Sequence, residues 1–146
     1  MAKEILFIDD EIVPGLTEPD GAYMWYYCEE LRKAGYIVDE AWETDLAIRK
    51  LAAREKPYAL IILDIMMPTG EEFDVPEAEG GLRTGVLLLD KILELSPKTP
   101  VLILTNVANP ETVHQVRRRP NVHKVLFKPD WPKEEVVSEV SLVLGG

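Results

Sequence analysis

The stretch Leu60-Ile61-Ile62-Leu63-Asp64, followed by Ile65-Met66-Met67-Pro68, decides the predicted fold because an unbroken aliphatic run ends abruptly at an acid. Such a run indicates a strand that is covered on both faces, as in a parallel sheet, since a half-exposed strand would alternate with polar residues. The quoted stretch supplies a strand over residues 59–63. Four further apolar runs predict strands at residues 5–8, 36–41, 101–104 and 122–127.

The segments between and after these runs have the apolar spacing of helices. Stripes at i, i+3 and i+4 follow every strand, and two helix starts are marked by turn residues. Asn109-Pro110 gives a capping residue and a first-turn proline, and Asp130-Trp131-Pro132 precedes the last stripe. Strands and helices that alternate in this way predict a doubly wound α/β fold, with helices on both faces of the sheet.

Length and composition favour one globular domain. The 146 residues contain 47% hydrophobic and 29% charged residues, and no linker or repeat interrupts them. We therefore expect a single domain over residues 1–146, without an output domain. No apolar run is long enough for a membrane span, and the start of the chain lacks the pattern of a signal peptide. A lone cysteine, Cys28, fits a reducing cytoplasm.

The net charge of −10 limits the kinds of molecule that the chain is expected to bind. A surface this negative repels nucleic acid and anionic lipid, so we expect neither direct nucleic-acid binding nor membrane insertion. The expected partners are cations and proteins with basic patches.

Polar residues stand where the predicted strands end. Asp9, Asp10 and Glu11 follow the first strand and Asp64 follows the third, while the fourth ends in Thr105 and the fifth in Lys128-Pro129. In open α/β sheets the functional groups gather beyond these carboxyl ends. Carboxylates that converge repel one another unless a cation joins them, and Mg²⁺ prefers such oxygen ligands.

This set of groups suits phosphoryl transfer. A carboxylate can act as the nucleophile and form an acyl phosphate, and a lysine and a hydroxyl can meet the remaining phosphoryl oxygens. A single aspartate at a strand end is more often a helix cap. Four strand ends that all present suitable groups favour the functional site instead.

The sequence resembles the receiver domain of bacterial two-component response regulators over essentially its whole length. The resemblance lies in four motifs, namely residues 5–11 (ILFIDDE), residues 60–68 (LIILDIMMP), Leu104-Thr105 and Phe127-Lys128-Pro129. It implies the flavodoxin-like topology, a five-stranded parallel sheet of order 2-1-3-4-5.

The resemblance also implies roles for individual residues. Asp64 is the phosphoacceptor, and a sensor histidine kinase or a phosphotransfer protein supplies its phosphoryl group. Asp10 and Asp64 ligate Mg²⁺ with the backbone carbonyl of Met66, and Asp9 acts directly or through water. Lys128 pairs with the phosphoryl oxygens, and the hydroxyl of Thr105 moves toward the phosphate. The chain would be a signalling switch with an unknown downstream protein target, and not a turnover enzyme.

The sequence departs from the family's pattern at four positions around this site. Val125 stands where the family usually has an aromatic residue, so either the switch moves less or its output is rewired. Asn106 follows Thr105 where a very small residue is usual. Met66 and Val107 occupy positions that influence attack by water on the acyl phosphate, and both are apolar. We therefore predict slow autodephosphorylation.

Two loops, residues 12–21 and 69–81, are roughly ten residues longer than is usual in the family. They are interpreted either as solvated surface loops or as a lid over the acceptor.

Two other functions stay open at this stage. A receiver-like scaffold that signals without phosphorylation would fit Val125 and Asn106. A Mg²⁺-dependent phosphatase with an aspartyl nucleophile usually needs a second acid two residues later, where this chain has Met66.

Overall fold

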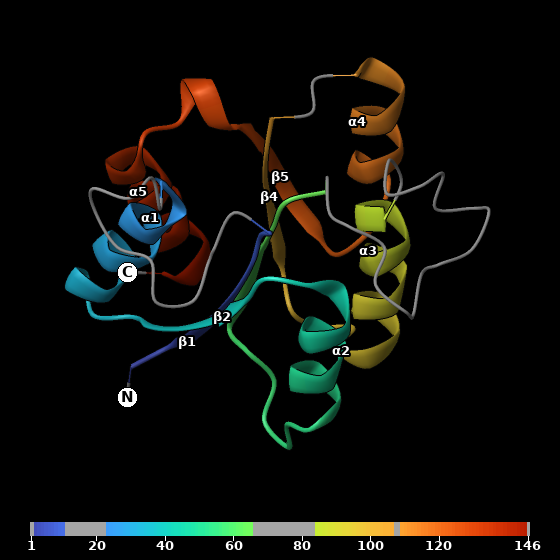
Figure 1. Cartoon of the computed structure of the whole chain (residues 1–146), viewed down its shortest axis with the longest axis horizontal. Coiled ribbons are helices and arrows are strands. Elements are labelled where there is room, and N and C mark those ends of the chain that lie inside the picture. Colours follow the sequence, from blue (N-terminus) through green and yellow to red (C-terminus); the bar gives the residue numbers. More distant parts are fainter. Residues whose placement is uncertain (1, 11–22, 66–83, 107–108, 146) are drawn as a thin grey trace.

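The computed structural model describes residues 2–10, 23–65, 84–106 and 109–145 (Figure 1). Within them five strands form one parallel sheet of order β2-β1-β3-β4-β5. The strands are β1 (Glu4–Ile8), β2 (Ile37–Ala41), β3 (Leu60–Leu63), β4 (Val101–Thr105) and β5 (Val122–Phe127). The predicted topology is confirmed.

The apolar runs are continuous because both faces of the sheet are covered. Alternate residues of β1 separate into two cores: Leu6 and Ile8 join one cluster, and Ile5 and Phe7 join the other. Every residue of β3 and β4 is buried. A strand with two dry faces has no position for a polar side chain until it ends.

Five α-helices in the described part of the chain cover the two faces. Figure 1 shows α1 (Tyr23–Lys33) and α5 (Lys133–Leu144) on one side of the sheet, and α2 (Thr44–Ala52), α3 (Thr84–Leu95) and α4 (Pro110–Arg117) on the other. None of the helices in the described ranges has the length and apolar character needed to span a membrane.

The two predicted helix starts are found close to their marked residues. The side chain of Asn109 accepts hydrogen bonds from the backbone N–H groups of Glu111 and Thr112, at 3.0 and 3.1 Å, and so caps α4. Before α5 the chain makes a short 3₁₀ turn, η2 (Lys128–Asp130), and the helix begins after Pro132. This turn begins at Lys128, the residue that directly follows β5.

Candidate functional site

The pairing of β1 with β3 places the first two acids side by side. Ile8 lies opposite Leu63, and the ladder continues one residue further, where the N–H of Asp64 donates to the carbonyl of Ile8 at 3.0 Å. On the other side, the N–H of Asp9 donates to the carbonyl of Ala41 at 3.0 Å. The backbones of Asp9 and Asp64 are therefore fixed by the sheet.

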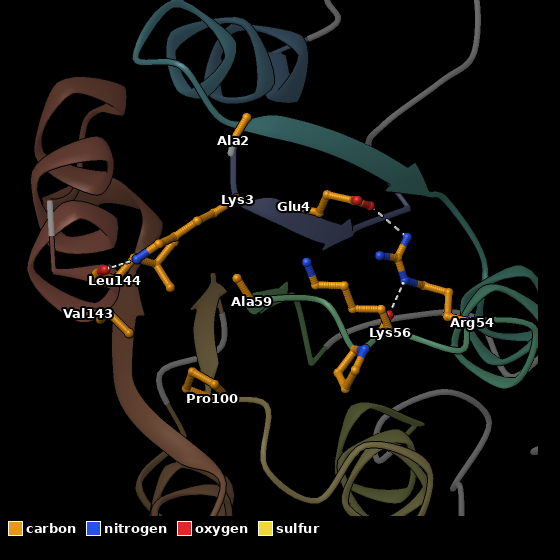
Figure 2. Close-up of a pocket in the computed structure, with 10 residues that line it drawn as sticks. Ala2, Lys3, Glu4, Arg54, Lys56, Ala59, Pro100, Val143 and Leu144 are labelled. Carbon is orange, nitrogen blue, oxygen red and sulfur yellow. Dashed lines mark hydrogen bonds and ion pairs between the residues drawn. The ribbon is translucent and has the colours of Figure 1, made fainter.

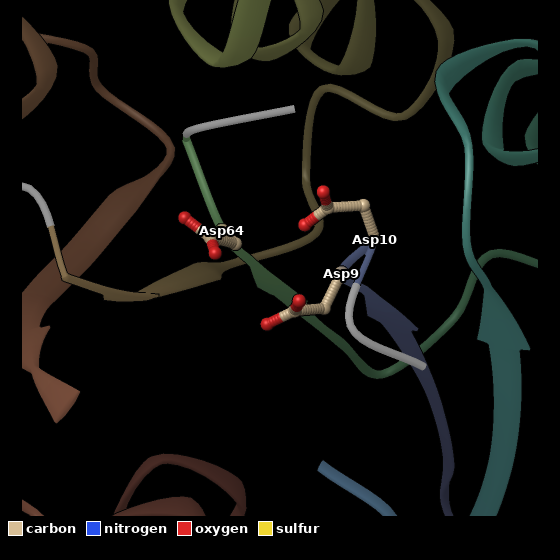
Figure 3. A group of neighbouring side chains, drawn as sticks. All are labelled: Asp9, Asp10 and Asp64. Atoms are coloured by element: carbon tan, nitrogen blue, oxygen red, sulfur yellow. The ribbon is translucent and has the colours of Figure 1, made fainter. Parts of the chain in front are cut away.

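Three carboxylates meet at this edge. Asp9, Asp10 and Asp64 each offer one oxygen, and these oxygens lie within 4.8 Å of one another. Figure 3 shows the three side chains beside one another, Asp9 and Asp10 after the end of β1 and Asp64 after the end of β3. Asp9 and Asp64 are buried, whereas Asp10 is exposed. Like charges this close destabilise each other, so the site favours the arrival of a cation.

Lys128 brings a buried positive charge to the same place. Its Nζ lies 3.0 Å from Oδ2 of Asp9 and 3.0 Å from Oδ2 of Asp64. Burial alone would lower the pKa of Lys128, but the negative charges of Asp9 and Asp64 outweigh burial and raise that pKa above its ordinary value. Lys128 therefore stays an ammonium ion. Among the described residues one cation faces three carboxylates, so this set of groups remains negative.

Thr105 supplies the remaining donor. It is fully buried at the end of β4, and its Oγ1 donates to Oδ1 of Asp64 at 2.7 Å. Lys128 donates to the other oxygen, Oδ2, at 3.0 Å. Each oxygen of Asp64 thus has a hydrogen-bond donor, and the two donors come from different strand ends. This arrangement fixes the orientation of the Asp64 carboxylate.

The backbone beyond Asp64 is held by a close contact with α3. The N–H of Gly85 donates to the carbonyl of Ile65 at 3.1 Å. A Cβ atom at position 85 would lie 2.1 Å from the Cα of Ile65, so only glycine fits there. The sequence did not single out Gly85, because a glycine near the start of a helix has no feature that marks a close backbone contact.

The donor set fits a hard divalent cation such as Mg²⁺, since it consists of carboxylate oxygens. Octahedral Mg²⁺ at about 2.1 Å from each ligand spans at most about 4.2 Å between two ligand atoms. The 4.8 Å spread is therefore slightly wide for three direct ligands. Asp10 and Asp64 would then hold the ion directly, and Asp9, which also faces Lys128, would hold it through water.

The other predicted positions divide into two groups. Asn106 is exposed directly after Thr105, and Val125 is half-buried on β5 opposite Ile103, where it packs against the cluster that includes Val86 and Ile92. Met66, Val107 and the loops 12–21 and 69–81 lie outside the described residues, so their predicted roles stay predictions.

Comparison with known proteins identifies the family. The family model described as "Response regulator receiver domain" matches residues 21–140. The chain therefore belongs to the response regulator receiver domain family, a family of signalling domains. A search of the curated proteins finds no match.

Solved receiver structures share the fold. A CheY-like receiver domain protein from Methanospirillum hungatei has a TM-score of 0.75 at 21% identity, with 99% of this chain and 95% of that chain covered. The chemotaxis response regulator CheY4 of Vibrio cholerae has a TM-score of 0.71 at 23% identity, with 99% and 100% covered. The signal receiver domain of an HD domain-containing protein from Pseudomonas fluorescens has a TM-score of 0.72 at 21% identity, with 99% and 96% covered.

Proposed function

We propose that this receiver domain is a phosphorylation-dependent switch in a two-component phosphorelay, and that Asp64 accepts the phosphoryl group. The donor would be a sensor histidine kinase or a phosphotransfer protein, and the downstream target another protein. The observation that carries the proposal is the setting of Asp64: Thr105 at 2.7 Å and Lys128 at 3.0 Å on its two oxygens, with Asp9 and Asp10 beside it. A cytoplasmic location belongs to the same proposal.

The proposed step is a simple displacement at phosphorus. An oxygen of Asp64 attacks the phosphorus of a phosphohistidine, so an O–P bond forms while the P–N bond breaks, and the electron pair returns to the imidazole nitrogen. Lys128 is placed to offset the charge on the phosphoryl oxygens. Asp9, Asp10 and Asp64, with the backbone carbonyl of Met66, would hold Mg²⁺, which neutralises the oxygens of the transferring group when it is bound.

The two donors on Asp64 suggest how the phosphate is sensed. Once one oxygen of Asp64 carries phosphorus, it loses most of its charge, and the phosphoryl oxygens become the better acceptors. The hydroxyl of Thr105 and the ammonium of Lys128 then move from the Asp64 carboxylate toward the phosphoryl oxygens. Thr105 ends β4, so its movement displaces the residues that lead into α4. The chain in this account assists its own phosphorylation but is not a turnover enzyme.

The acyl phosphate should be long-lived. Met66 and Val107 are apolar and offer no group that could orient an attacking water. A phosphate lifetime of seconds in the purified protein would contradict this expectation.

Incubation with acetyl phosphate tests the function. In the presence of Mg²⁺ we expect the intact protein to gain the mass of one phosphoryl group, and we expect no gain with a chelator. Asp64→Asn should abolish the gain. Asp90→Asn is the matched control, since Asp90 lies on α3 and pairs with Arg119 outside the site. Failure of the unsubstituted protein to become labelled would favour a receiver-like scaffold that signals without phosphate.

A further inference from the structure

A hollow lies at the end of the sheet opposite the aspartate cluster, where β1, β3 and β4 begin (Figure 2). Its volume is about 430 Å³, which lies in the range of roughly 300–1,000 Å³ that is usual for small-molecule sites. We call it the basic pocket, and it is lined by Ala2, Lys3, Glu4, Arg54, Lys56, Pro57, Ala59, Pro100, Val143 and Leu144. The proposed phosphotransfer uses none of these residues.

The charges of the basic pocket differ from those of the chain. The chain has a net charge of −10, yet among the described residues Lys3, Arg54 and Lys56 line this pocket with a single carboxylate, Glu4. Glu4 is already engaged, because its Oε2 lies 2.7 Å from Nη1 of Arg54. The pocket therefore carries a positive charge that its own residues do not balance. Such a site attracts small anions.

Arg54 is held in place before any ligand arrives. Its Nε donates to the carbonyl of Lys56 at 2.9 Å, and its guanidinium lies 3.9 Å from the centre of the ring of Tyr58. Tyr58 is buried and in turn donates to Asp39 at 2.6 Å. A side chain fixed in this way loses little further freedom on binding, which favours affinity.

Lys56 is the cation directed into the hollow. Figure 2 shows its side chain reaching toward the middle of the basic pocket, between Glu4 and Ala59. No residue in the described ranges forms an ion pair with its ammonium group. Lys3 differs, because it donates to the carbonyl of Leu144 at the end of α5. A ligand with an anionic group would therefore meet Lys56 first.

The remaining walls are apolar. Val143 and Leu144 close one side from α5, while Pro57, Ala59 and Pro100 contribute carbon surface from the loops and strand starts. A bare inorganic ion would leave these walls in contact with water. A ligand with an aliphatic part would cover them and gain from the removal of apolar surface from water.

We propose that the basic pocket binds a small organic anion, with its carboxylate or phosphate group at Lys56, near Arg54 and Lys3, and a short aliphatic part against Val143 and Leu144. The site is independent of the phosphoacceptor function. It lies where β1 and β3 begin, whereas Asp9 and Asp64 follow the other ends of the same strands.

Titration of the isotope-labelled full chain, followed by backbone amide NMR shifts, tests this proposal. The probes are hexanoate, its neutral analogue hexanamide, acetate and inorganic phosphate. We expect hexanoate to shift the amides of Lys3, Ala59 and Leu144 at lower concentration than acetate or inorganic phosphate does. Hexanamide should have little effect. Equal binding of hexanamide, or of inorganic phosphate, would overturn the proposal.

Substitutions locate the site. Lys56 is exposed, so Lys56→Gln should fold normally, and we expect it to weaken hexanoate binding roughly tenfold, as expected for the loss of a charge-assisted hydrogen bond. Lys56→Arg should retain binding. Lys91→Gln, on α3, is the matched control and should bind as the unsubstituted chain does. Unchanged affinity in Lys56→Gln would contradict the proposed position of the anion.

Discussion

At the scale of single residues, the site depends on how Asp64 is held. Its two carboxylate oxygens have different donors, a hydroxyl on Oδ1 and an ammonium on Oδ2. The ammonium of Lys128 is shared with Asp9. Removal of the Thr105 hydroxyl should therefore affect how the protein responds to phosphorylation more than how readily Asp64 is phosphorylated. The ammonium of Lys128, whose charge favours phosphoryl transfer, stays in place.

Thr105→Val tests this division of roles. Valine has nearly the shape of threonine but no hydroxyl, so Asp64 should still gain a phosphoryl group from acetyl phosphate. The shifts that a beryllofluoride mimic causes in the amides of Leu104 and Asn106 should be largely lost. Thr105→Ser keeps the hydroxyl and should keep those shifts. If Thr105→Val responded to beryllofluoride as the unsubstituted chain does, the hydroxyl would not be the sensor.

Asp10→Asn separates charge repulsion from metal binding. Without Mg²⁺, loss of one of three close carboxylates relieves repulsion, so we expect the unfolding temperature to stay equal or rise. In the unsubstituted chain, Mg²⁺ at one hundred times its dissociation constant should stabilise the fold by about 2.7 kcal/mol. This gain should largely disappear in Asp10→Asn.

Calorimetry with and without Mg²⁺ measures both effects. Glu55→Gln is the control for the loss of one negative charge, because Glu55 is exposed in the connection between α2 and β3. A full Mg²⁺ stabilisation in Asp10→Asn would remove Asp10 from the proposed ligand set.

At the scale of elements, the contact between Gly85 and Ile65 joins the start of α3 to the residue after Asp64. The hydrogen bond from Gly85 to Ile65 requires that the two backbones approach closely. The position of α3 and the position of Asp64 are therefore coupled.

Gly85→Ala should disturb the position of α3 and the position of Asp64. The new methyl group would meet backbone atoms, which cannot rotate away, and overpacking of this kind typically costs about 1–3 kcal/mol. We expect a lower free energy of unfolding in urea and slower phosphorylation by acetyl phosphate. Ser138→Ala, at an exposed position of α5, should change neither. If Gly85→Ala had the stability of the unsubstituted chain, the close contact would be wrong.

The elements were largely predictable from the sequence. Buried strands have apolar runs that end where the strands end, and parallel strands bring those ends to one edge of the sheet. The residues at that edge, Asp9, Asp64, Thr105 and Lys128, could therefore be placed near one another from the sequence alone. The family resemblance supplied the strand order. The observed starts of β1, β2 and β3 each differ from the predicted ones by one residue.

Contacts between distant side chains and backbones were not predictable. Gly85 touches Ile65, but this contact has no periodic pattern in the sequence. The basic pocket was missed for the same reason, since Lys3, Arg54 and Lys56 come together only when β1 and β3 pair.

At the scale of the whole molecule, the two ends of the sheet differ in charge. The carboxyl ends of the strands carry the aspartate cluster, and the basic pocket lies at the amino ends. A third charged group, on the α2 side of β2, joins Asp39 to Lys50 and Tyr58. This group makes part of the stability of the fold depend on pH.

Asp39 should stabilise the fold above acidic pH. Burial raises the pKa of Asp39, but the hydrogen bonds from Lys50 and Tyr58 outweigh burial and hold that pKa below its ordinary value. The ordinary value for an aspartate is about 3.9. A carboxyl group whose pKa is lower in the folded than in the unfolded chain stabilises the fold at pH values above its unfolded-state pKa. This contribution is lost as the pH falls through the folded-state pKa.

Urea unfolding over a range of pH measures the effect. We expect Asp39→Asn to be less stable than the unsubstituted chain at neutral pH, and the difference to shrink below about pH 4. Glu55→Gln should follow the unsubstituted curve. A difference that stays constant through the acidic range would show that Asp39 does not contribute through its charge.

The most direct test of the account is to locate the phosphate. After incubation with Mg²⁺ and acetyl phosphate, borohydride reduces an aspartyl phosphate to homoserine, and peptide mass spectrometry identifies the modified residue. We predict homoserine at position 64 alone, and only when Mg²⁺ is present. Modification at Asp9 or Asp10, or an unmodified Asp64 in protein that has gained a phosphoryl group, would contradict it.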